Sequence, residues 1–122
     1  MKTLNIDNNK GLLFPEATGV SGAVRIGEVY YEVINSSYTT EGTNNTKTLN
    51  ATVRKLGGRK SVDLHITRSP FTQEKAPKFI SNEFVVDGVD YQVVGWTAVS
   101  KTTNKSLISL AVNEVKNYDF DL

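Results

Sequence analysis

The sequence predicts an all-β protein, a small antiparallel barrel or sandwich with roughly seven strands. Short runs of alternating apolar and polar residues recur along the chain, and no stretch has a convincing helical period. Turn residues separate these runs. The strongest turn is Asp87-Gly88, because a type I′ hairpin needs positive φ at both central residues and these two residue types tolerate it.

The fold prediction is clearest for residues 81–114. The Asp87-Gly88 turn and the polar connection 101–105 divide this stretch into three consecutive antiparallel strands, a β-meander. Gly95 interrupts the middle strand and predicts a bulge or a sharp coil there.

The chain before this meander follows the same pattern. Residues 2–6 predict a short edge strand, and the apolar residues 12–14 form an anchor that Pro15 ends. The connector 69–79 contains a proline near each end, Pro70 and Pro77, and has room for one helical turn at most. Further strands are expected at 23–26, 29–38, 47–56 and 61–67.

Two parts of the chain are similar to each other. A glycine turn opens a strand that contains Tyr-x-Val at 27–33 and again at 88–93, and in both cases a lysine precedes the leucine of the next strand. The chain therefore reads either as two echoed β-meanders or as a fortuitous match between strands of similar composition.

Composition excludes several classes of function. A chain of 122 residues with 39% hydrophobic content fits one domain, which we place at 1–116, followed by an acidic and aromatic C-terminal tail at 117–122. The absence of cysteine and the single His65 argue against a metal site, and no catalytic or cofactor-binding motif is present. We expect a protein that is not an enzyme and has no cofactor. No apolar run approaches membrane-spanning length, so a cytoplasmic location is expected, in the host cell if the protein is viral.

Charge is unevenly distributed along the chain. Net charge is only +1, yet residues 47–105 hold ten basic against five acidic side chains, with aromatic residues between them. Single-stranded nucleic acid is held by this combination, because cations follow the phosphates while aromatic faces stack on bases. The alternative is a solvated surface over aromatic residues that belong to the core.

Several short motifs resemble those of a known family. They are Gly11-Leu12-Leu13-Phe14, Lys75-Ala76-Pro77-Lys78-Phe79, Val86-Asp87-Gly88-Val89-Asp90-Tyr91, Gly95-Trp96 and the segment 100–110, Ser-Lys-Thr-Thr-Asn-Lys-Ser-Leu-Ile-Ser-Leu. This pattern, mainly within residues 75–112, resembles small single-stranded-DNA-binding proteins of phages and mobile elements, which are OB-like. The resemblance implies binding of single-stranded DNA without sequence specificity or catalysis, in replication or recombination. It also implies that the tail recruits replication or recombination proteins through Tyr118, Asp119, Phe120, Asp121 and Leu122.

On this hypothesis, aromatic residues stack on bases and basic residues neutralise phosphates. The expected stacking residues are Trp96, Tyr30, Tyr38 and Phe79, and the expected phosphate contacts are Arg54, Lys55, Arg59, Lys60, Lys78, Lys101 and Lys105. Strands that are apolar on both faces further predict self-association, as a homodimer. The alternative function is a β-sandwich interaction protein, either a viral structural component or an inhibitor of a host defence enzyme. Near-zero net charge and the many Thr, Asn and Ser residues in loops favour this alternative.

Overall fold

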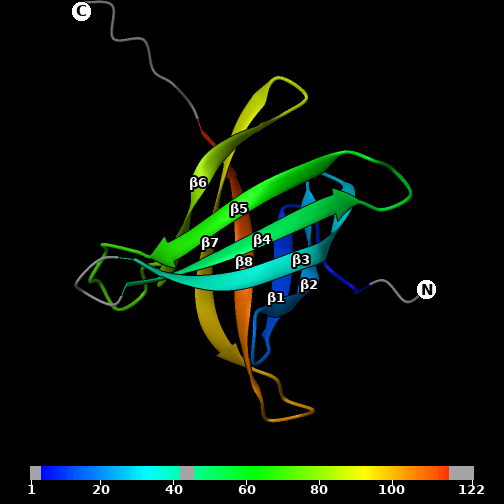
Figure 1. Ribbon diagram of the computed structural model, residues 1–122. Helices are drawn as coiled ribbons and strands as arrows, with labels where there is room; N and C mark the ends of the chain where they lie inside the picture. Colours follow the sequence, from blue (N-terminus) through cyan, green and yellow to red (C-terminus); the bar gives the residue numbers. More distant parts are fainter. Residues whose placement is uncertain (1–3, 42–45, 116–122) are drawn as a thin grey trace, which may run out of the picture.

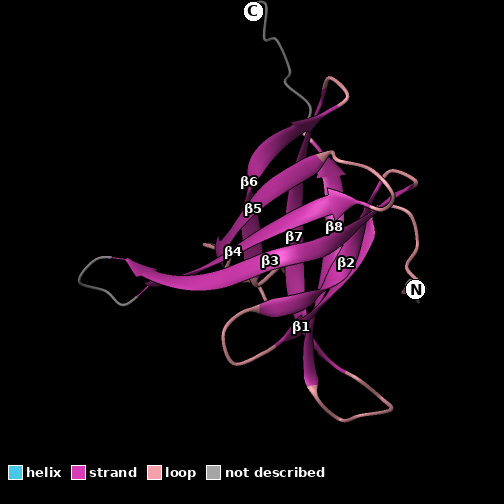
Figure 2. Ribbon diagram, turned by 45° about the vertical axis from the view of Figure 1, so that its right-hand side comes forward, coloured by secondary structure: helices cyan, strands magenta, loops and turns pink. Residues whose placement is uncertain are grey.

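The computed structural model describes residues 4–41 and 46–115, which form strands and loops without a helix (Figure 2). There are eight strands in this part of the chain. They are β1 (Lys10–Pro15), β2 (Val20–Ile26), β3 (Val29–Glu41), β4 (Thr46–Lys55), β5 (Ser61–Arg68), β6 (Phe79–Val86), β7 (Val89–Val99) and β8 (Ser106–Glu114). The predicted all-β class is confirmed.

The strands close into one antiparallel barrel (Figure 1). Each strand pairs with its neighbours in sequence, and β8 returns to pair with β1 through contacts such as Gly11 with Leu110. Of the two predicted architectures, the barrel is the one observed. Its strand order is sequential, or up-and-down, whereas the OB fold in the strict sense is a five-stranded Greek-key barrel.

The prediction differs from the structure at the N-terminal part of the chain. The apolar anchor at 12–14 is a full strand, β1, which brings the number of strands to eight. The expected edge strand at 2–6 is absent from its described part, residues 4–6. Ile6 is instead buried, and the backbone N–H of Leu4 donates to the hydroxyl of Tyr30 at 2.9 Å.

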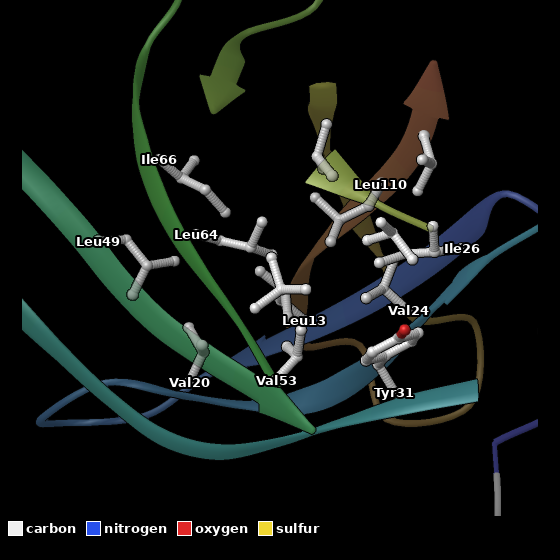
Figure 3. Packing of buried hydrophobic residues seen from close by; sticks show 14 residues of the cluster. Leu13, Val20, Val24, Ile26, Tyr31, Leu49, Val53, Leu64, Ile66 and Leu110 are labelled. Carbon is white, nitrogen blue, oxygen red and sulfur yellow. The ribbon is translucent and has the colours of Figure 1, made fainter. Parts of the chain in front are cut away.

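The core fills the barrel with aliphatic side chains around Tyr31, which is 1% exposed (Figure 3). Because successive side chains of a strand point to opposite faces, the alternating residues Val62, Leu64 and Ile66 of β5 all point inward and are buried. Burial of one face of each strand is the main source of stability, and it fixes the register of the ladders.

Turn geometry agrees with the prediction at the central hairpin and differs at Gly95. Asp87 and Gly88 have φ of 52° and 79°, as a type I′ turn requires. At Gly95 the ladders run without a shift, and the irregularity lies across on β6, between Ile80 and Glu83. A Cβ atom at Gly95 would lie 3.1 Å from side-chain atoms of β8, so this glycine permits close packing rather than a bulge.

The up-and-down order places successive loops at opposite ends of the barrel. We call the end that carries residues 16–19, 69–78 and 100–105 the connector end. The opposite end, with residues 27–28, 56–60 and 87–88, is called the ion-pair end, because Lys60 and Asp87 form a salt bridge there. The two similar meanders correspond to β2–β4 and β6–β8, on different sides of the barrel, and their common origin stays a prediction.

Candidate nucleic-acid interface

The predicted phosphate-binding residues fall on both ends of the barrel. Arg54, Lys55, Arg59 and Lys60 surround the turn between β4 and β5 at the ion-pair end, whereas Lys78, Lys101 and Lys105 lie at the connector end. The eight residues of β5 separate the two groups by roughly 25 Å, at about 3.3 Å per residue. The structure therefore presents two basic regions instead of one continuous path.

The connector end has the more uniform charge. Residues 16–19, 68–79 and 100–105 hold five exposed cations against two acids, Glu16 and Glu74. These cations are Arg68, Lys75, Lys78, Lys101 and Lys105. An excess of one sign over neighbouring loops attracts polyanions, because the fields of the separate charges add.

A hollow of about 460 Å³ lies at this end, beside two of these cations. Two aromatic residues line it: Phe71, whose side chain is 51% exposed, and Phe79, which packs partly against the core. The remaining lining residues are Arg68, Ser69, Thr72, Lys78 and Thr97. Aromatic faces beside cations and hydroxyl groups are suited to a planar base with its attached phosphate.

Trp96 attaches the connector to the barrel. Its indole Nε1–H donates to the backbone oxygen of Lys75 at 3.2 Å, and the backbone N–H of Lys78 donates to the oxygen of Gly95 at 2.8 Å. These bonds hold residues 75–78 against β7. Trp96 thus helps to position the connector, and this bond uses the edge of the indole and not its stacking face, so its role in stacking stays a prediction.

The two tyrosines predicted to stack on bases differ in how accessible their rings are. Tyr38 is 39% exposed on β3, and its hydroxyl donates to the oxygen of Gly19 at the connector end. Tyr30 lies elsewhere on the barrel, with the guanidinium carbon of Arg25 5.6 Å from its ring centre. A tyrosine whose ring already faces a cation and whose hydroxyl accepts a hydrogen bond from Leu4 is poorly placed to stack on a base.

At the ion-pair end, acids offset the basic turn. The side chain of Lys60 binds the carboxylate of Asp87, and this bond lowers the pKa of Asp87 and raises the pKa of Lys60. The adjacent strands add the acids Asp90 and Glu83. Burial beneath this end raises the pKa of Tyr31. A region of mixed sign with one cation already paired is a weaker phosphate site than the connector end.

Sequence reasoning left three residues out of the candidate set: Arg68, Lys75 and Phe71. Phe71 could have been recognised as a candidate for base stacking, because it is a large aromatic residue in a polar connector directly after a proline. Arg68 and Lys75 could be added only once the connector was seen to fold back on β7, since their distance in sequence from Lys101 conceals their position at the same end.

His65 lies on the outer polar face, with Nδ1 2.7 Å from the Oδ1 atom of Asn50. Within residues 4–41 and 46–115, no group of three or more His, Cys, Asp or Glu side chains could hold a metal ion. Nor does this part of the chain contain a helix that is long and apolar enough to span a membrane.

The predicted partner-binding residues Tyr118, Asp119, Phe120, Asp121 and Leu122 lie outside the described residues, so their role stays a prediction. Comparisons of the chain with protein-family models, with curated proteins and with solved structures found no match.

Proposed function

We propose that the protein binds single-stranded DNA without sequence specificity and without catalysis, through the connector end of the barrel. The observation that carries this proposal is the hollow lined by Phe71, Phe79, Arg68 and Lys78, at the end of the barrel that holds five exposed cations. Stacking does not distinguish bases strongly, and phosphate contacts carry no sequence information. Such a protein covers strands that are exposed during replication or recombination.

The geometry suggests how a strand would lie. One base stacks on the exposed ring of Phe71 at the hollow. Arg68 and Lys78, which also line the hollow, bind the phosphate of this nucleotide. The hairpin of β7 and β8 extends beyond this point, with Lys101 roughly 16 Å along the strand direction from Trp96, at about 3.3 Å per residue. Cations along this hairpin neutralise the following phosphates.

Fluorescence of Trp96 offers a direct test, because it is the only tryptophan and its indole is bonded to the connector. Adding a dT oligonucleotide at low salt should change this fluorescence and saturate. Stacking is worth about 1–3 kcal/mol per base, so Phe71→Ala should weaken binding about 5- to 150-fold. Leu56→Ala removes an exposed apolar side chain at the opposite end and is the matched control.

Absence of saturable binding at low salt would refute the proposal. The alternative from the sequence, a viral structural protein or an inhibitor of a host defence enzyme, would then be the hypothesis to pursue. Equal losses of affinity in Phe71→Ala and Leu56→Ala would show that DNA binds elsewhere on the barrel.

A further inference from the structure

A hairpin projects from the barrel at the connector end, where β3 is followed by β4 (Figure 2). The ladder between β2 and β3 stops short of Ser36, whose hydroxyl bonds the backbone of Val20 instead. On the other side, β4 pairs with β5 only as far as Leu49. Within the described part of the chain, residues 37–41 and 46–48 therefore pair only with each other. We call these residues the arm.

The hairpin of β7 and β8 projects at the same end, on the opposite side of the barrel. Pairing of β7 with β6 ends at Gly95 and pairing of β8 with β1 ends at Ile108, so residues 98–99 and 106–107 have no other strand beside them among the described residues. Around the closed barrel, β3 and β7 are four strands apart in either direction. The two hairpins therefore face each other across the opening, which we call the mouth. Strands about 4.8 Å apart and tilted by about 40° make this mouth roughly 16 Å wide.

The inner face of the barrel continues onto both hairpins, because side chains alternate along a strand. Tyr38 of the arm lies opposite the buried Leu49, and Lys47 is the next residue of β4 on that face. On β7, Val99 shares a face with Thr97, which lines the hollow. Both hairpins thus turn these side chains toward the mouth.

Exposed apolar side chains gather around the mouth. Val99 is 60% exposed, Phe71 51% and Tyr38 39%, and they are three of the six exposed large apolar residues within residues 4–41 and 46–115. The connector that carries Phe71 follows β5, which lies midway between β3 and β7 around the barrel. Apolar side chains concentrated at one opening indicate contact with a ligand, and the cations beside them indicate that the ligand is an anion.

We infer that a single strand of DNA crosses the mouth, from the hairpin of β7 and β8 past the hollow to the arm, where Tyr38 and Lys47 form a second nucleotide subsite. This inference rests on the proposed function and adds the path of the strand on the other side of the hollow. At about 3.4 Å per stacked nucleotide, roughly five nucleotides span the mouth.

The second subsite has both groups that one nucleotide requires. The hydroxyl of Tyr38 donates to the backbone oxygen of Gly19 at 3.1 Å, which holds the ring at the edge of the mouth and satisfies its polar atom. A base can then stack on the exposed ring. Lys47 is the diagonal neighbour of Tyr38 in the ladder, about 7–8 Å away, so the same nucleotide can place its phosphate near the ammonium group.

Titration of the full chain with a dT oligonucleotide of about 12 nucleotides tests the inference. Lys47→Gln should make the slope of log K against log salt concentration flatter by about 0.7, since one phosphate contact is lost. Lys55→Gln is the matched control, because Lys55 is exposed on the same face of β4 at the opposite end of the barrel. Its slope should equal that of the parent.

Two substitutions of Tyr38 test stacking separately from charge. Tyr38→Ala should weaken binding about 5- to 150-fold, as expected for the loss of one stacked base. Tyr38→Phe keeps the ring and removes only the bond to Gly19, so it should bind like the parent. An equal loss of affinity in both variants would show that the hydroxyl positions the loop at Gly19, and it would overturn stacking at Tyr38.

The remaining outcomes separate this inference from the proposed function. If the parent does not bind the oligonucleotide, both fail. If the parent binds and Phe71→Ala weakens binding, but Lys47→Gln and Tyr38→Ala behave like the parent, only the path across the mouth is overturned. Equal slopes for Lys47→Gln and Lys55→Gln overturn it as well. If Tyr38→Ala fails to fold, the comparison of the two lysine variants decides, because both side chains are exposed.

Discussion

Salt dependence of DNA binding distinguishes the two ends of the barrel. Each phosphate contact to a single strand contributes about −0.7 to the slope of log K against log salt concentration. If each of the five connector-end cations meets one phosphate, the slope is about −3.5. Affinity then falls about 130-fold between 50 and 200 mM salt.

Replacing Lys101 and Lys105 together by glutamine should change the slope to about −2.1, so that affinity falls only about 20-fold over the same range. The comparison variant carries Lys55→Gln and Arg59→Gln at the ion-pair end, with the same change in net charge. Its slope should stay at the parent value. Fluorescence titrations of a dT oligonucleotide at several salt concentrations give all three slopes.

The parent and both variants should keep the same melting temperature, because all four lysine and arginine side chains are exposed. A comparison variant with the flatter slope would show that the strand follows the basic turn at 54–60, which the sequence also allowed. A parent slope near zero would refute phosphate binding at either end.

Three further predictions concern stability. Asn82→Ala should lower the free energy of unfolding in urea by about 1 kcal/mol, because it removes hydrogen bonds to two backbone groups of β5; an unchanged value would show that water replaces them fully. Gly95→Ala should cost about 1–3 kcal/mol through overcrowding against β8, and a neutral result would mean that the β8 side chains move aside. The pKa of Asp87 is lowered by Lys60, so its stabilising effect is present above the unfolded-state pKa and is lost as pH falls through the lower folded-state pKa. Asp87→Asn should therefore melt below the parent near neutral pH and match it in strong acid, and a difference that does not change with pH would contradict the ion-pair explanation.

Strand positions and the central turn followed from the sequence because they depend on local interactions. Alternation of Val62, Leu64 and Ile66 with polar residues identifies a strand with one buried face, whatever its partner. Asp87-Gly88 defines its turn through the φ angles that these two residues tolerate. Both features act within a few residues, so the rest of the chain does not have to be known.

Barrel closure was decided by tertiary structure. It requires β1 to pair with β8, which brings Lys10 beside Ala111, and no pattern within either segment specifies the other. The division of the basic residues also depends on strand order. Successive loops of a meander alternate between ends, so the turn near Lys60 and the connector near Lys75 lie apart although they are neighbours in sequence.

The hydrogen bond between Trp96 and the connector could not be predicted from the sequence either. Its strand position indicates an outward side chain, which is suitable for stacking on a base. The connector folds back, however, and the backbone oxygen of Lys75 accepts the hydrogen bond of the indole. Sequence alone determined the strands, the central turn and the kinds of side chain available for binding. Only the closed barrel decided which of these side chains meet, because that depends on contacts between residues far apart in the chain.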